Sequence, residues 1–187
     1  MIFNGTVYRD QLSIKEQWKD YFQQLYSPSE CIRFDQQWKH HIDIKLNEAV
    51  TNSVLSNSAA VSPEDVSKAL TKCKKNKACG TDLNYYEHFI YGGQFITKVL
   101  SLLYSGMFRF GYIPSNIKKG VIVTVHKGGS KRKDDPNNYR AITLTPVILK
   151  IYELILLDRC KDKIVSKLNV QQGGFQEGLG CLMTSFF

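Results

Sequence analysis

The sequence predicts an α+β protein that is mainly helical and carries one β-hairpin. Apolar residues recur at helical spacing in several segments with cap signals, whereas a single pair of short β-prone runs flanks a polar loop. With 43% apolar content in 187 residues, the chain can build a core as one domain, or one domain plus an appendage. It shows no apolar signal segment and no membrane-length apolar run, so we expect it to be neither secreted nor membrane-spanning. Its five cysteines are scattered and form no CxxC pair, which indicates reduced thiols in a nuclear or cytoplasmic protein.

The first helix is expected from Ser13 to about Tyr26. Ser13 and Glu16 have the spacing of a capping box, and Ser27-Pro28 follows the helix. Helical spacing then links the apolar residues Ile14, Trp18, Tyr21, Phe22 and Leu25. Residues 29–60 are polar and weakly periodic, which predicts a connector with one short helix near 43–55.

A second helix is expected after Ser62, with Pro63 in its first turn and two acids at its positive end. It leads into a basic turn, Lys74 to Asp82, that Gly80 closes. A third helix is predicted from Gln94 to Phe110, where Gly111 stops it.

The last helix is expected to start at Thr145-Pro146 and to run through Leu156 to about Arg159. It is apolar on nearly all sides, so we expect it to be buried.

The hairpin is predicted from an apolar run, Val121–Val125, and a second β-prone run, Ala141–Leu144. Between residues 116 and 150 eight Lys or Arg stand against two Asp, a net of plus six out of the formal +8 of the whole chain. Charge concentrated in one loop favours an anionic partner, either nucleic acid or a nucleotide.

Within this hairpin, Lys127 and Arg140 are expected to face each other at the base of the loop. A guanidinium and an ammonium there suit phosphate groups. Alternatively, Arg140 pairs with Asp134 or Asp135 and only holds the loop. At the tip, Lys131, Arg132 and Lys133 either contact nucleic-acid backbone or are simply solvated.

Other candidate site residues point to structure rather than chemistry. The histidines have no metal-ligand spacing, and we expect His126 to pack between strands. Asp82 after a Gly-Thr pair favours a turn or cap over a metal ligand. Tyr85, Tyr86 and Phe89 can stack bases, although core packing explains their spacing better.

Several motifs in the correct order resemble the reverse transcriptase domain of non-LTR (LINE-type) retrotransposons, from Ser62 to Phe187. They are KKNKACGTD, where the family usually has Pro in place of Thr81; GYIPSNIKKGVIVTVHKGG followed by NNYRAITL, where the family most often has Pro in place of Ala141; and QGGF, from Gln172, with Gly178. The segment WKDYF, from Trp18, resembles the linker between such polymerases and an endonuclease domain.

The resemblance implies the fingers and the start of the palm of a right-hand polymerase, truncated before the catalytic palm motifs. Residues 1–60 would be a helical linker and residues 61–187 the incomplete reverse transcriptase domain. Lys127 and Arg140 would bind the incoming nucleotide, and Lys131, Arg132 and Lys133 the nucleic acid. The partners of the complete protein would be an RNA template, a DNA primer and a dNTP, with no membrane.

The same resemblance implies Mg²⁺ for the full-length polymerase but no cofactor in this chain. The palm aspartates are absent, so we expect no catalytic and no metal-binding residue, and no activity of the chain alone. The palm and endonuclease domains would be missing. Whether the chain counts as an enzyme stays open, because the alternative is a catalytically inert nucleic-acid-binding remnant that uses the basic hairpin.

Overall fold

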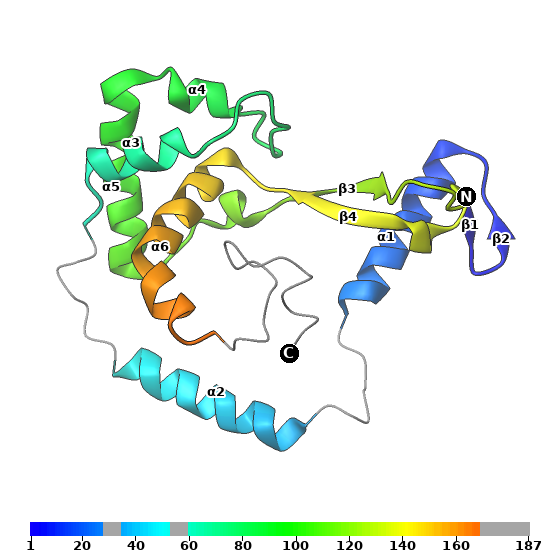
Figure 1. Ribbon diagram of the computed structural model, residues 1–187. Helices are drawn as coiled ribbons and strands as arrows, with labels where there is room; N and C mark the ends of the chain where they lie inside the picture. Colours follow the sequence, from blue (N-terminus) through cyan, green and yellow to red (C-terminus); the bar gives the residue numbers. More distant parts are fainter. Residues whose placement is uncertain (28–34, 53–59, 169–187) are drawn as a thin grey trace, which may run out of the picture. The chain divides into compact units, whose positions relative to one another are not determined.

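The computed structural model describes residues 1–27, 35–52 and 60–168 (Figure 1). Over these residues the structure is 58% helical with small antiparallel sheets, which confirms the α+β class. The described residues divide into two compact units: one falls within residues 1–56 and 122–143, and the other within residues 57–121 and 144–187. The hairpin is therefore grouped with the N-terminal segment. The division at residues 1–60 and 61–187 stays a prediction. The QGGF element lies outside the described residues.

The first unit opens with a small hairpin of β1 (Ile2–Phe3) and β2 (Thr6–Val7), in which Ile2 pairs with Val7. The turn between the strands is left-handed at Asn4 and Gly5, with φ of 49° and 81°. Asparagine and glycine tolerate this conformation, which tight hairpin turns need.

Helix α1 (Gln11–Tyr26) begins earlier than the sequence predicted. Its N-cap is Asp10, whose carboxylate accepts a hydrogen bond from the Ser13 amide at 2.7 Å. Asp10 already satisfies that donor, so Ser13 lies inside the first turn and the predicted capping box is wrong. The predicted end at Tyr26 is confirmed.

Helix α2 (Gln36–Thr51) replaces the short helix expected near 43–55. Asp35 caps it by accepting from the Trp38 amide at 2.9 Å. None of its residues is buried, which explains why apolar periodicity gave a weak signal.

The basic hairpin consists of β3 (Val121–His126) and β4 (Tyr139–Leu144), with a short 3₁₀ turn, η3 (Pro136–Asn138), before β4. Both predicted strands are confirmed. Aromatic rings join α1 to the hairpin, since Trp18 lies 5.2 Å from Tyr139 and 5.2 Å from Phe3 between ring centroids, edge to face.

The second unit is helical. Its elements are α3 (Pro63–Thr71), α4 (Tyr86–Ile90), α5 (Gly93–Phe110), η2 (Ser115–Lys118) and α6 (Val147–Val165). Ser62 and Asp65 form a reciprocal capping box at α3, which confirms its predicted start. Helix α5 ends as predicted at Gly111, which is left-handed with φ of 58°.

The core of this unit lies between α3, α5 and α6. Val66, Tyr104 and Ile151 are fully buried in it. Tyr104 donates to the Ile148 carbonyl at 2.9 Å, and burial raises the pKa of its hydroxyl. The basic turn runs close to the start of α6, because a Cβ at Gly80 would lie 2.6 Å from the Pro146 nitrogen. Glycine is therefore required there.

Burial of the two long helices differs from the prediction. Helix α6 is buried along its first half, but Leu156 and Leu157 are exposed. Helix α5 carries a much more exposed apolar stripe, with Phe95, Leu102 and Phe110 each at least 75% exposed. The prediction of burial all round α6 is thus only half correct. Of the helices described, none is long and apolar enough to cross a membrane.

Candidate nucleic-acid interface

The loop between β3 and β4 has a backbone fixed by its own polar side chains. Asp135 accepts from the Asn137 amide at 2.9 Å and from its side-chain nitrogen at 3.0 Å. Asn138 donates to the Arg132 carbonyl at 3.0 Å, and the Tyr139 hydroxyl donates to the Lys133 carbonyl at 2.7 Å. These four hydrogen bonds fix the path of the loop, so its cationic side chains have a defined arrangement.

Two glycines directly after β3 allow the chain to turn into the loop. Gly128 and Gly129 have φ of 79° and 68°, a conformation that side chains disfavour. The Gly128 amide donates to Nδ1 of His126 at 3.1 Å, and the His126 ring packs against Tyr139 at 5.1 Å. His126 is thus a packing residue between strands, as predicted.

The N-terminal segment supports the loop from a second side. The Ile2 amide donates to the Asp134 carbonyl at 2.7 Å. From α1, the Tyr21 hydroxyl donates to Asn137 at 3.4 Å. Sequence reasoning missed this support, although the aromatic stripe of α1 signalled that the helix packs on a partner.

Lys127 and Arg140 do not face each other directly. The Lys127 amide donates to the Asn138 carbonyl at 2.8 Å, and this register places Arg140 opposite Val125. The Lys127 ammonium donates to the Asn137 carbonyl at 2.6 Å, so its charge is not neutralised by that contact. Both side chains are exposed on the same hairpin.

Arg132, and not Arg140, pairs with the loop aspartate. Its Nε and Nη2 lie 3.0 and 2.7 Å from the two carboxylate oxygens of Asp134. These hydrogen bonds lower the pKa of the Asp134 carboxyl, which is therefore ionised at neutral pH. The alternative in which Arg140 closes the loop through Asp134 or Asp135 is wrong, because Arg140 forms no ion pair with either carboxylate.

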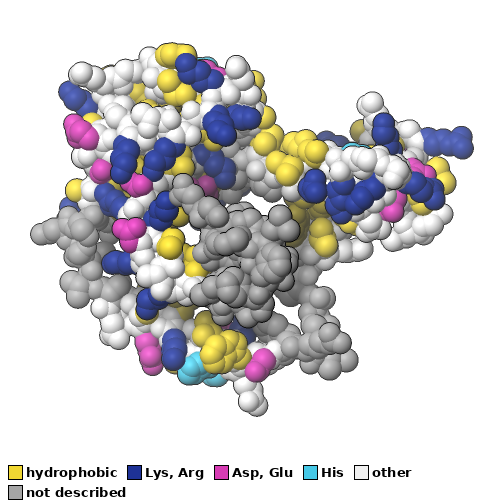
Figure 2. Space-filling view, viewed as in Figure 1, with side chains coloured by type: hydrophobic (Ala, Val, Ile, Leu, Met, Phe, Trp, Pro, Cys, Tyr) yellow, Lys and Arg dark blue, Asp and Glu magenta, His cyan; other side chains and the backbone are white. Residues whose placement is uncertain are grey.

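The two lysines at the tip of the loop and Arg140 in β4 are exposed. In the described part of the chain no carboxylate forms an ion pair with Lys131, Lys133 or Arg140. Figure 2 shows dark blue Lys and Arg side chains grouped over the loop end of the hairpin. The arrangement can bind phosphate oxygens without first breaking an ion pair.

The basic turn after α3 is built differently. The Asn76 amide donates to the Glu87 carboxylate at 2.6 Å, and Lys75 donates to the Tyr91 hydroxyl at 2.5 Å. Asp82 accepts from the Asn84 side chain at 2.9 Å, which fits the predicted turn role. The predicted core role is confirmed for Phe89, which is buried.

A metal site is not assembled in the part of the chain that the structure describes. No three His, Cys, Asp or Glu side chains come together there in a way that could hold an ion. The Mg²⁺ that the resemblance implies finds no ligand set among these residues.

Comparison with known proteins identifies relatives in Drosophila melanogaster, although no family model matches the chain. The RNA-directed DNA polymerase from the mobile element jockey is 32% identical over 107 residues, 56% of this chain and 12% of the relative. The 115 kDa protein of the type-1 retrotransposable element R1DM is 35% identical over 83 residues, 44% of this chain and 8% of the relative. A protein of transposon X-element, by its name also an RNA-directed DNA polymerase, is 26% identical over 181 residues, 94% of this chain and 19% of the relative.

The curated homologues of this chain are therefore RNA-directed DNA polymerases of non-LTR retrotransposons, at modest identity and partial coverage. This finding confirms the resemblance that the motifs indicated. The chain spans less than a fifth of the length of the curated relatives it matches.

Proposed function

We propose that this chain contributes the nucleotide- and template-contacting fingers of an RNA-directed DNA polymerase of a non-LTR retrotransposon. The proposal rests on the loop between β3 and β4. Hydrogen bonds fix the backbone of this loop, and its exposed lysines, Lys131 and Lys133, form no ion pair with a described carboxylate. The names of the relatives support the same chemistry. An RNA template, a DNA primer and a dNTP are the proposed partners in the complete polymerase, which would also use Mg²⁺.

Arg140 is the proposed contact for the triphosphate of the incoming nucleotide. A guanidinium can bind two phosphate oxygens at once, and Arg140 makes no ion pair among the described residues that would compete. Lys127 is the second contact. Its ammonium is held by a neutral carbonyl, which leaves the full positive charge for a phosphate.

The tip of the loop is the proposed contact for template backbone. Lys131 and Lys133 would bind phosphates as point charges, independently of base sequence. Arg132 shares its guanidinium with Asp134, so it would contribute less than a lysine beside it.

Nucleotide binding tests the role of Arg140. The anisotropy of a fluorescent dNTP would be titrated with the full chain, with Arg140→Ala and with Arg140→Lys. Since a hydrogen bond to a charged group contributes roughly 1.5–3 kcal/mol, Arg140→Ala should weaken binding by about 10- to 150-fold. Arg140→Lys should recover part of the loss, because it restores the charge without the bidentate geometry.

Arg109→Ala is the matched control, since Arg109 is exposed on α5 and far from the loop in sequence. It should leave dNTP affinity unchanged. Equal affinity of the Arg140→Ala and unaltered chains would contradict the assignment of Arg140 to the nucleotide.

A further inference from the structure

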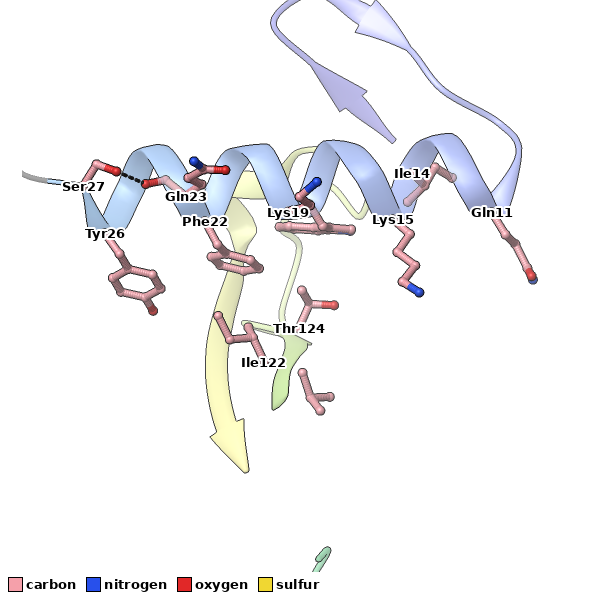
Figure 3. Close-up of a pocket in the computed structure, with 12 residues that line it drawn as sticks. Gln11, Ile14, Lys15, Lys19, Phe22, Gln23, Tyr26, Ser27, Ile122 and Thr124 are labelled. Carbon is pink, nitrogen blue, oxygen red and sulfur yellow. Dashed lines mark hydrogen bonds between the residues drawn. The ribbon is translucent and has the colours of Figure 1, made fainter. Parts of the chain in front are cut away.

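A groove runs between α1 and β3, on the part of the hairpin away from the loop. Its volume is 860 Å³, and its walls include Phe22 and Tyr26 from the helix and Ile122 from the strand. Figure 3 shows Lys15, Phe22 and Tyr26 pointing from α1 to the side where Ile122 and Thr124 lie. The contacts proposed above for the loop do not use this groove.

Three aromatic rings of α1 form a stacked ladder along the groove. The rings of Trp18 and Phe22 are nearly parallel, with centroids 5.3 Å apart and an angle of 16°. Phe22 and Tyr26 continue the ladder at 6.2 Å and 17°. The ladder arises because the three residues are spaced by four positions and so lie on one helix face.

The ladder ends at Tyr26 with a ring that is largely open. Within the described ranges Phe22 is the ring that stacks on Tyr26, and Tyr26 is 61% exposed. An exposed ring at the end of a parallel stack is a platform for one more flat ring.

The positive charge of the groove favours a negatively charged ligand. Among the described residues its lining contains Lys15 and Lys19 but no Asp or Glu. Lys19 lies 3.4 Å from Glu16, but both side chains are more than 60% exposed, so this ion pair is weak. A ligand that fits has flat apolar rings and a negative backbone, which describes single-stranded nucleic acid.

We propose that this groove binds single-stranded nucleic acid through its bases, with one base stacked on Tyr26 as the next ring of the ladder. Lys15 and Lys19 contact the phosphates on either side of that base. The proposal extends the proposed function, because it requires the chain to bind nucleic acid. It uses different residues and a different force, since the hairpin loop binds phosphate and the groove binds bases.

An abasic oligonucleotide separates the two forces. It keeps the phosphates of a short labelled oligothymidine and lacks its bases. The full chain should bind oligothymidine about 5- to 150-fold more tightly than the abasic strand of equal length, as the stacking of one base on an aromatic ring provides. Tyr26→Ala should abolish this preference and leave affinity for the abasic strand unchanged.

Leu25→Ala is the matched control, since Leu25 is a neighbour on α1 with 58% exposure and does not line the groove. It should keep the preference in full. Both positions are exposed, so both variants should retain the helical circular-dichroism signal and unfolding midpoint of the unaltered chain.

The outcomes distinguish this inference from the proposed function. Equal binding of both strands by the unaltered chain, or a preserved preference in Tyr26→Ala, overturns the base-binding groove and leaves the phosphate-binding loop standing. Lys131→Ala with Lys133→Ala should weaken binding of both strands by the same factor. Absence of binding to either strand would overturn the proposed function as well.

Discussion

The helical unit and the hairpin loop both carry many cations, but they differ in what those side chains contact. In the helical unit Lys68 and Lys72 both bind Asp158, at 2.6 and 2.8 Å. In the hairpin loop only Arg132 is paired with a carboxylate, among the residues described, while Lys131 and Lys133 are exposed.

The difference shows that a count of positive charges in the sequence overstates the phosphate-binding surface. A lysine that already shares a carboxylate must exchange one partner for another, whereas an exposed lysine only releases water and counterions. The same contrast holds for apolar side chains, since the helical unit buries Ile151 and the hairpin leaves Val125 46% exposed.

The largest effect is expected when a buried apolar side chain of the helical unit is compared with an exposed one of the hairpin. Ile151→Ala removes a fully buried side chain from the helical core, and should lower the free energy of unfolding by about 2–5 kcal/mol. Val125→Ala, on the exposed face of the hairpin, should change it by roughly 0.5 kcal/mol or less. Urea denaturation of both variants measures the difference. A larger loss in Val125→Ala would show that this hairpin face is covered in solution.

A second experiment removes an ion pair from the helical unit, so that its lysines become unpaired like those of the loop. Asp158→Asn removes the carboxylate that Lys68 and Lys72 share, so both ammonium groups become available to phosphate. Affinity for a single strand should rise several-fold at low salt, and the salt slope should steepen by up to about 1.4 units for two new phosphate contacts. Unchanged affinity and slope would mean that these lysines lie away from any bound strand.

The smallest expected effect is the pH dependence of the same ion pairs. Hydrogen bonds from Lys68 and Lys72 lower the pKa of Asp158 to about 2, from its ordinary value of 3.8. Because the folded-state pKa is lowered, this contribution to stability is present above about pH 4 and is lost as the pH falls towards 2. The unaltered chain should lose slightly more stability than Asp158→Asn between these pH values, as measured by urea midpoints. Parallel losses would contradict the shift.

Local signals in the sequence predicted most of the fold, but not its long-range contacts. The Ser62 cap, the stop at Gly111 and both strands of the hairpin follow from residues within a few positions of each other. Asp10 caps α1 in place of Ser13, since a carboxylate at the right spacing is at least as good an acceptor as a hydroxyl. The need for Gly80 arises from the approach of Pro146, far along the chain, which no local pattern reveals.

The candidate site was predicted as a charge cluster and not as a geometry. The sequence indicated which residues are cationic, but the pairing of Arg132 with Asp134 depends on the path of the loop. The position of Arg140 opposite Val125 depends on the register, which the Asn138 carbonyl and the two glycines determine together. Likewise, the contact of Trp18 with Tyr139 joins segments more than a hundred residues apart.

The salt dependence of single-strand binding tests the central claim most directly, which is that the exposed lysines of the hairpin loop bind phosphate. The slope of log affinity against log salt would be measured for the full chain, for Lys131→Ala with Lys133→Ala, and for Lys39→Ala with Lys45→Ala. The last pair removes the same charge from exposed positions of α2. The loop variant should flatten the slope by about 1.4 units, at roughly 0.7 per phosphate contact, and the α2 variant should leave it unchanged. An unchanged slope in the loop variant, or an equal change in both, would contradict the account.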